Sequence, residues 1–488
     1  MTKIAQMILL LIIAIQVSAQ SRKENLNTFF STLSKNGQFN GNVLIAENGN
    51  IIYEKSFGYA DLSSKRLNTK QTSFAIASIT KTFTSTAILQ LKQEGKLKLD
   101  DTVSKFLPDF PYKEVTIKHL LSHTAGLPIY DSLFFSYIPN HPDTVFKNKD
   151  LIPAFILKKA PLIFKPGEDF SYNNVNYNIL ALVVEKLSGK SFESYLEEHI
   201  FKPSGMTNTS LSRFFRREDK ELSKRYNFKF PYSDKPQLVD TVSEFRIMSH
   251  FDFQGQGDII STTHDLLNYS RALESRSLID EANLKEAFTP VKLRNGKDNA
   301  QRYALGWITR EDTSLGEIVK HDGGMPGGRT MLLKNLTKHQ TIILFDNNGN
   351  NVVPIADHAL SILNGLAIEK PKKSVSRIYG ITMANLGVNA GNKVIERIRK
   401  DTVNYYLSEG QINDLGYAFL FNNKEMEAEA AFKKNTQLFP LSWNVYDSYA
   451  EVLLRKGNKA DAIKMYQKSV ELNAANENGK KVLEQLLK

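Results

Sequence analysis

Hydrophobic and polar positions divide the first part of the chain into short elements. Two apolar runs flank Glu47-Asn48-Gly49-Asn50, and the Asn-Gly pair predicts a β-hairpin over residues 40–60. Apolar residues with helical spacing then run from Ser78 to Glu94, directly before Gly95. This period predicts a helix that begins at Ser78 and ends at the glycine.

Later elements follow from the same periodicity and from residues that begin or end helices. Asn173-Asn174 suits a helix N-cap, and Gly189 ends the helix that we predict after it. Residues 130–160 are aromatic, contain proline and show little periodicity, so we expect a loop-rich insert that walls a cleft. The other predicted elements are a short helix before Gly126, a helix after Ser261-Thr262, a strand from Ile318 to the glycine turn at Gly323-Gly324, strands over Met331–Lys334 and Thr341–Phe345, and a closing helix over Ile355–Leu366.

The last part of the chain repeats itself at a constant offset of 34 residues. The matched residues are Leu415 and Tyr449, Gly416 and Ala450, Leu420 and Leu454, Ala428 and Ala462, and Phe432 and Tyr466. This pattern resembles two tetratricopeptide (TPR) repeats, closed by a final helix. Because two repeats are few for independent stability, we expect them to pack on residues 375–408 or on the preceding domain. They would form either a plain helical hairpin or a module that binds a peptide of a partner protein.

The polar, proline-bearing segment Lys370-Pro371-Lys372-Lys373-Ser374 marks a domain boundary. We therefore predict a signal peptide over residues 1–19, a large domain over 20–369, a linker or helical connection over 370–408, and helical repeats over 409–488.

The N-terminus has the features of a signal peptide. Lys3 precedes the apolar run Met7–Ile15, and Val17-Ser18-Ala19 supplies small residues for cleavage before Gln20. We expect an exported protein, periplasmic or secreted, that is cleaved after Ala19. The alternative is an N-terminal membrane anchor, although the apolar run is shorter than a usual membrane span.

The amino-acid composition excludes some classes of function and of site. With 41% hydrophobic and 24% charged residues the chain resembles an ordinary globular protein. Its net charge of +11 is spread along the chain, so we expect a solvated basic surface and no nucleic-acid partner. The absence of cysteine excludes disulfides and cysteine-based metal sites or nucleophiles.

Ser78 and Lys81 are the first candidates for chemistry. On a helix they lie one turn apart on the same face, so their side chains can meet. A serine hydroxyl needs a neighbouring base to take its proton, and a lysine can be that base when burial lowers its pKa. The helix start adds unpaired N–H groups that suit a developing oxyanion.

Two other patterns have structural explanations. His119 and His123 are four residues apart, but no glutamate lies between them in the zinc-protease pattern and no third ligand is near, so we expect packing or capping. Gly255-Gln256-Gly257 precedes a helix but lacks the lysine of a phosphate-binding loop, so we expect a tight structural turn.

Three motifs stand in order along the chain: Ser78-x-x-Lys81, Tyr172-x-Asn174 and His321-x-Gly323. Together they resemble the serine β-lactamase and penicillin-binding-protein superfamily, and within it the class C-like group of D,D-carboxypeptidases, D-aminopeptidases and esterases. The resemblance covers roughly residues 25–367 and includes His123-Thr124-Ala125-Gly126-Leu127. It implies an α+β fold of the β-lactamase/transpeptidase type, with a mostly antiparallel sheet flanked by helices and a cleft beside an all-helical lobe.

The resemblance also implies roles for the motif residues. Ser78 would attack a carbonyl group, and Lys81 and Tyr172 would share the proton transfers; which of the two is the base stays open. Asn174 would bind the substrate, and the N–H groups of Ser78 and Gly324 would form the oxyanion hole beside Gly323. His321 would stand where relatives carry a lysine or histidine and would act as a cation or proton donor, whereas in isolation a histidine at the end of a strand is better explained by a packing or turn role. No metal or organic cofactor is implied.

The middle residue of the third motif departs from the family pattern. Relatives usually have threonine or serine there, whose hydroxyl helps to bind a substrate carboxylate, whereas this chain has Asp322. An ionised aspartate would repel a carboxylate, although Arg329 could compensate. The change favours esters, amides or substrates with a free amino group.

We therefore predict a serine hydrolase with the activity of an esterase, a D-amino-acid peptidase or a β-lactamase, acting on a small molecule or peptide. One alternative is an inactive relative that binds envelope peptides, and another is a scaffold that acts through its repeats.

Overall fold

The computed structural model describes residues 21–211, 220–241 and 249–488, and the predicted signal peptide lies outside the described residues. The chain divides into two compact units. The first, here called the α/β unit, comprises Met1–Asn227 and Leu238–Ile368. The second, here called the helical unit, comprises Phe228–Gln237 and Glu369–Lys488.

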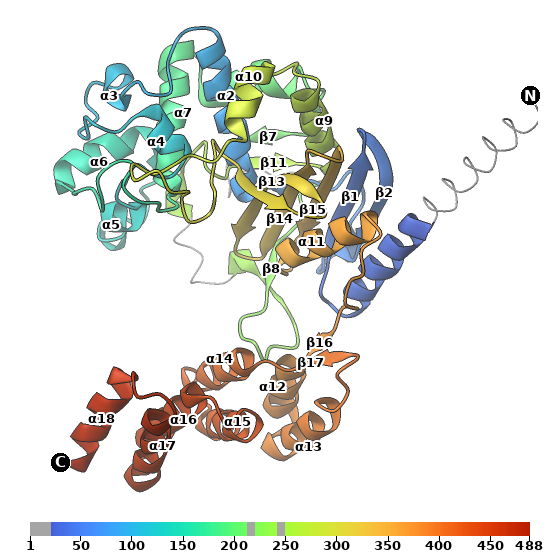
Figure 1. Cartoon of the computed structure of the whole chain (residues 1–488), viewed down its shortest axis with the longest axis vertical. Helices are drawn as coiled ribbons and strands as arrows, with labels where there is room; N and C mark the ends of the chain where they lie inside the picture. Colours follow the sequence, from blue (N-terminus) through green and yellow to red (C-terminus); the bar gives the residue numbers. More distant parts are fainter. Residues whose placement is uncertain (1–20, 212–219, 242–248) are drawn as a thin grey trace, which may run out of the picture. The chain divides into compact units, whose positions relative to one another are not determined.

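A six-stranded antiparallel sheet lies at the centre of the α/β unit (Figure 1). Its side chains alternate between two cores: Val43 and Ile45 belong to one, and Leu44 belongs to the other. The strands, in spatial order, are β12 (Ile308–Asp312), β13 (Gly316–Met325), β14 (Gly328–Asn335), β15 (Gln340–Asp346), β1 (Gly41–Glu47) and β2 (Asn50–Phe57). The predicted antiparallel sheet is confirmed.

Helices cover both faces of this sheet. A helix over residues 21–35 and α11 (Val352–Leu363) contribute to one core. Helices α2 (Thr80–Gln93) and α9 (Thr263–Glu274) contribute to the other. Beside α2 lies a helical lobe, seen at the upper left in Figure 1, made of α3 (Val103–Phe106), α4 (Ile117–Leu121), α5 (Tyr130–Phe134), α6 (Leu151–Lys158), α7 (Asn174–Ser188) and α8 (Phe192–Leu196). The predicted arrangement, an antiparallel sheet flanked by helices beside an all-helical lobe, is confirmed.

The segment 130–160 is more regular than its sequence indicated, because it contains both α5 and α6. Pro153 does not break α6, because it is the third residue, where a helical N–H has no partner within the helix. Leu151 and Phe155 are buried one turn apart. The expectation of a loop-rich insert holds for residues 135–150, which consist of turns, loops and very short elements, but not for α5 and α6.

The helical unit contains seven helices, the paired short strands β16 (Lys373–Ser374) and β17 (Tyr405–Tyr406), and the segment Phe228–Gln237, here called the excursion. The helices are α12 (Val375–Leu386), α13 (Val388–Ile398), α14 (Glu409–Leu420), α15 (Glu425–Leu438), α16 (Trp443–Arg455), α17 (Lys459–Leu472) and α18 (Glu477–Leu487). In the excursion, the Tyr232 ring stacks on Phe419 with centroids 4.2 Å apart. Repeats of the TPR type and their peptide-binding role stay predictions. Among the described residues no helix has the length and apolar character of a membrane span.

Candidate active site

The first motif lies where a short 3-10 turn, Ala77–Ile79, leads into α2. Ser78 is half-buried in this turn, whose first N–H groups have no partner within the helix. Ala77 has a φ of 48°, in the left-handed region that side chains with a Cβ rarely adopt. Backbone strain of this kind concentrates at functional sites, and here it lies directly before the serine.

Lys81 is fully buried within reach of this serine. Its Nζ lies 3.1 Å from Ser78 Oγ, 2.8 Å from Asn174 Oδ1 and 2.7 Å from the carbonyl oxygen of Gln256. All three partners are uncharged, so among the described residues no opposite charge in direct contact offsets the loss of hydration of the ammonium. Burial therefore lowers the pKa of Lys81 from 10.5 to about 7, although two nearby carboxylates oppose the change.

The second motif meets the first at the start of α7. Asn173 is the N-cap residue, as predicted, and its side chain accepts a backbone N–H at 3.0 Å. Tyr172 lies just outside the helix, close enough to Ser78 for the two side chains to interact, and its ring centroid is 4.9 Å from the Lys81 ammonium. Although 37% of Tyr172 is exposed, desolvation of the phenol raises its pKa above the ordinary value.

Strand β13 brings the third motif to the same place. It pairs with β14 as far as Met325 but with β12 only as far as Lys320, so residues 321–325 keep one edge without a strand partner among the described residues. A Cβ on Gly323 would lie 2.2 Å from the carbonyl oxygen of Ile76. Only glycine therefore lets the strand approach the segment that carries the serine.

Gly324 offers a hydrogen-bond donor at this free edge. Its neighbour Met325 pairs with Gly328 across a two-residue loop, so the alternation of the ladder turns the Gly324 N–H away from β14. Gly324 is exposed, and a Cβ there would lie 2.2 Å from Arg329 Nη1. The N–H groups of Ser78 and Gly324 together suit an oxyanion.

His321 differs from the cation that we expected. It is buried, and its Nδ1 donates to the Asp322 carbonyl oxygen at 2.7 Å while its Nε2 accepts from the Tyr303 hydroxyl at 2.9 Å. Burial, with the charge of Lys81, lowers the pKa of His321 to about 4. At neutral pH it is an uncharged group that supports β13 from inside the protein, which agrees with the packing interpretation and not with a cation or proton donor.

The histidines four residues apart have separate roles. His119 Nδ1 accepts the Thr116 backbone N–H at 3.2 Å and caps α4. His123 is fully buried, accepts the Asn173 backbone N–H at 3.2 Å and places its ring centroid 4.3 Å from that of Tyr172. Capping and packing are confirmed, and His123 packs against a residue of the site.

The glycine turn at residues 255–258 belongs to the site, which sequence reasoning missed. Gln256 supplies the carbonyl oxygen that accepts from Lys81, and the charge of Asp258 acts on the same ammonium. The glycines before the Ser261-Thr262 pair were a signal of the turn, but nothing in the sequence showed that it faces Lys81. Tyr303, the partner of His321, had no sequence signal at all.

Asp322 is half-buried and its charge acts on Lys81, Tyr172 and Tyr303. The carboxylate that departs from the family pattern therefore lies close enough to influence the reacting groups.

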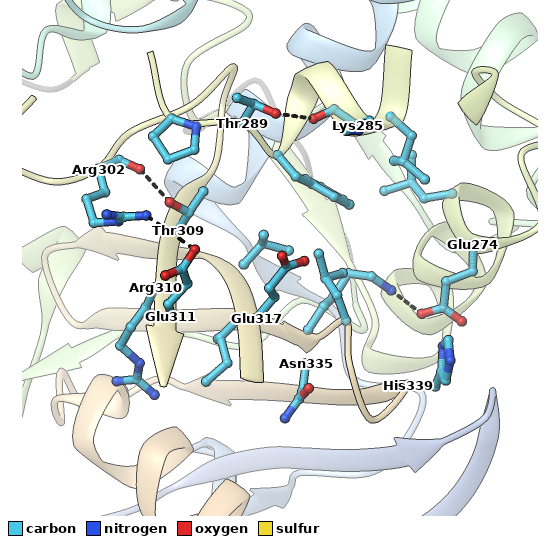
Figure 2. A pocket seen from close by; sticks show the side chains of 18 of the residues that line it. Glu274, Lys285, Thr289, Arg302, Thr309, Arg310, Glu311, Glu317, Asn335 and His339 are labelled. Carbon is cyan, nitrogen blue, oxygen red and sulfur yellow. Dashed lines mark hydrogen bonds and ion pairs between the residues drawn. The ribbon is translucent and has the colours of Figure 1, made fainter. Parts of the chain in front are cut away.

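A separate cavity of about 520 Å³ lies toward the other end of β13 and β14 (Figure 2). Charged side chains such as Glu274, Glu317 and Arg302 line it, and none of its lining residues belongs to the three motifs. Among the described residues no group of three or more His, Asp, Glu or Cys could hold a metal ion.

Known proteins are similar to this chain in sequence. A family model described as Beta-lactamase matches residues 26–363. The chain is 35% identical to Penicillin-binding protein 4* of Bacillus subtilis (strain 168) over 368 residues, which covers 73% of this chain and 80% of that relative.

Solved structures of known proteins have a similar fold. The penicillin binding protein from Bacillus halodurans matches with a TM-score of 0.58 and 26% identity, over 68% of this chain and 99% of that chain. The D-amino acid amidase from Ochrobactrum anthropi SV3, complexed with D-phenylalanine, matches with a TM-score of 0.58 and 20% identity, over 70% and 99% of the two chains, and shows a likeness of fold. With its three motifs gathered in one site, the chain belongs to the Beta-lactamase family and is a homologue of penicillin-binding proteins.

Proposed function

We propose that the protein is an exported serine hydrolase that forms an acyl-enzyme on Ser78 with an ester, amide or peptide substrate. The observation that carries this proposal is the distance of 3.1 Å between Ser78 Oγ and the Nζ of a buried lysine whose pKa is about 7. Near neutral pH a large fraction of such an amine is uncharged and able to accept the serine proton. A solvated lysine, with a pKa near ~10.4, would stay charged.

The reaction begins when Ser78 Oγ attacks the substrate carbonyl carbon and its proton moves to Lys81. The oxyanion accepts hydrogen bonds from the N–H groups of Ser78 and Gly324, each worth about 3–4 kcal/mol. The bond to the leaving group then breaks, and the leaving oxygen or nitrogen takes a proton from Tyr172, which recovers one from Lys81. Water hydrolyses the serine ester, releases the acid and restores the free hydroxyl.

Lys81 is the better candidate for the base at neutral pH. Burial disfavours the charged form of both candidates, so it lowers the pKa of Lys81 and raises the pKa of Tyr172. Lys81 therefore becomes easier to deprotonate, and Tyr172 becomes harder to deprotonate. A tyrosinate would therefore be scarce, whereas the neutral amine is abundant. The phenol fits the role of a relay between Lys81 and the leaving group.

The charge beside the third motif favours a particular substrate class. Asp322 repels a carboxylate near the scissile bond and attracts an ammonium group, so amides or esters of amino acids with a free amino group fit best. A D-amino acid amidase has the same fold, so D-amino-acid amides are the first substrates to test.

The test is hydrolysis of p-nitrophenyl esters, D-amino-acid amides and peptides, and β-lactams by the purified protein. Ser78→Ala should abolish turnover and labelling by a fluorophosphonate while the circular dichroism spectrum stays the same. Ser270→Ala is a matched control, because Ser270 also contacts a buried lysine, Lys334, which forms an ion pair with Glu274. Retained turnover in Ser78→Ala would reject the mechanism.

Export is the second part of the proposal, and it rests on the apolar run and the small residues before Gln20. N-terminal sequencing of the mature protein should begin at Gln20. A protein that keeps residues 1–19 would instead support the membrane anchor.

A further inference from the structure

Asp258 is a buried carboxyl group that the reaction scheme does not use. It is 1% exposed, and its Oδ1 accepts the N–H groups of Gly255 at 2.7 Å and Gly257 at 3.4 Å. Its Oδ2 has no hydrogen-bond partner among the residues that the structure describes. A buried carboxyl oxygen without a partner is costly, so its presence asks for an explanation.

The turn that Asp258 closes is wedged between α2 and α7. Thr84 on α2 donates to the Gly255 carbonyl oxygen at 2.7 Å. On the other side, a Cβ on Gly255 would lie 2.6 Å from the Tyr177 carbonyl oxygen of α7. The turn therefore has little freedom, and its Gln256 carbonyl oxygen faces Lys81 Nζ at 2.7 Å.

We propose that Asp258 is a positioning residue of the active site: it shapes the turn that presents the Gln256 carbonyl to Lys81, and it places a buried negative charge beside that ammonium. This inference rests on the acyl-transfer function proposed above. In this arrangement Asp258 sets the pH range in which Lys81 gains and loses its proton.

The electrostatics agree with the geometry. Burial raises the pKa of Asp258 to about 7, and the charge of Asp258 opposes the lowering of the Lys81 pKa. The two groups thus gain and lose protons over the same pH range, and the Asp258 carboxylate favours the charged form of Lys81, while the charge of Asp252 adds to the raised pKa of Asp258. The other titratable groups around Lys81 are Tyr172 and Tyr177 at α7, His123 after α4, and His321 and Asp322 on β13.

Asp258→Asn separates the charge from the hydrogen bonds, because asparagine keeps an oxygen for the Gly255 N–H. Without the negative charge, the Lys81 ammonium should lose its proton about one pH unit lower. The measurement is a titration of the Lys81 Cε signal in protein labelled with 13C-lysine, assigned by its absence in Lys81→Met. The limb of the kcat/KM profile that reports Lys81 should move by the same amount, with KM within about twofold of wild type.

Asp346→Asn is the matched control. Asp346 is also 1% exposed, also accepts backbone N–H groups, and also has a pKa raised by burial, to about 6, but it is not among the groups whose charge acts on Lys81. Its replacement should leave the Lys81 titration unchanged. Asp258→Ala, which loses the acceptor as well, should lower kcat at least tenfold, and Asp258→Asn should restore most of that loss near the pH optimum.

An unchanged Lys81 midpoint in Asp258→Asn would overturn the proposal. If that variant does not fold, the wild-type titration decides: two coupled steps for Lys81 support the proposal, and a single step contradicts it. Because the titration needs no turnover, it gives an answer even if the protein hydrolyses nothing, an outcome that would refute the proposed function alone.

Discussion

Replacing the buried amine of Lys81 by an apolar group of similar size should change how stability depends on pH. Lys81→Met removes the ionisable group but keeps the volume of the side chain. Three acceptors, Ser78 Oγ, Asn174 Oδ1 and the Gln256 carbonyl oxygen, lose a donor. That loss costs stability by a constant amount, because none of the three acceptors titrates in this pH range.

The pH-dependent part follows from the pKa of Lys81, which is about 7 in the folded protein and 10.5 for a solvated lysine. Between these values the unfolded chain binds a proton that the folded protein does not, so stability rises with pH. At pH 7 the free-energy cost of the buried amine is about 4 kcal/mol, and at pH 9.5 it is about 1.5 kcal/mol. The wild type should therefore gain about 3 kcal/mol relative to Lys81→Met over this range.

The two tryptophans make this measurement possible in the intact chain. Trp307 is buried in the α/β unit, and Trp443 lies in the helical unit. In a Trp443→Phe background, Trp307 fluorescence during guanidinium unfolding reports the α/β unit alone. A difference between wild type and Lys81→Met that stays constant from pH 7 to 9.5 would show that Lys81 has an ordinary pKa, and the case for it as a base would fail.

Three further predictions test other parts of the structure. Tyr172→Phe should lower kcat by about 10²–10⁴-fold with little change in KM, measured on an ester substrate, because a proton relay is lost; a loss below tenfold would exclude that role. Asp322→Thr should raise kcat/KM for a carboxylate-bearing substrate at least tenfold relative to its amino-bearing analogue, and an unchanged ratio would show that Asp322 does not select substrates. Tyr232→Ala should destabilise the helical unit by about 3 kcal/mol, measured by Trp443 fluorescence, because a buried aromatic ring is lost; unfolding at wild-type denaturant concentrations would contradict the packing of that ring.

Local periodicity explains why several elements could be predicted from the sequence. The helix expected from Ser78 to Glu94 corresponds to α2 at Thr80–Gln93, and the helix expected after Asn173-Asn174 corresponds to α7 at Asn174–Ser188. The strand at Thr341–Phe345 corresponds to β15 at Gln340–Asp346. In each case apolar residues repeat with a helical or strand period and a cap or turn residue marks the end.

Electrostatics could not be predicted in the same way, because they depend on burial and on residues distant in sequence. Histidine in the third motif suggested a cation, yet Tyr303 and the protein interior keep His321 neutral. The partners of Lys81 include Asn174 and Gln256, which lie 93 and 175 residues away along the chain. No period or spacing in the sequence connects these positions.

The helical unit shows a second limit of sequence reasoning, because it contains residues 228–237 from the middle of the chain. Arg377 in α12 donates to the carbonyl oxygens of Pro231 at 3.2 Å and Ser233 at 2.9 Å, and Tyr232 enters the hydrophobic core of the unit. Deleting residues 369–488 would therefore expose this segment to solvent. Such a truncation therefore changes the environment of residues 228–237 as well as removing the C-terminal helices.

The residues that flank the excursion, Tyr226–Asn227 and Leu238, are here called its stem. The stem belongs to the α/β unit and lies near the third motif. Tyr226 in β8 (Tyr226–Asn227) donates its N–H to the Asn347 carbonyl oxygen at 2.8 Å, and a Cβ on Gly327, in the loop after β13, would lie 2.8 Å from Tyr226 N. A stem without its anchored tip would loosen next to the catalytic strand. We therefore expect simple deletion of residues 369–488 to reduce hydrolysis.

Replacing 228–236 by an Asn-Gly turn in the same deletion should restore hydrolysis, because β8 and β9 (Gln237–Leu238) already pair and a two-residue loop can join them. Steady-state rates on one ester substrate, together with Trp307 unfolding curves, compare the two truncated proteins. Equal loss of activity in both would mean that the helical unit itself acts on the site. Full activity in the simple deletion would mean that the stem needs no anchor, and that the helical unit serves a purpose separate from catalysis.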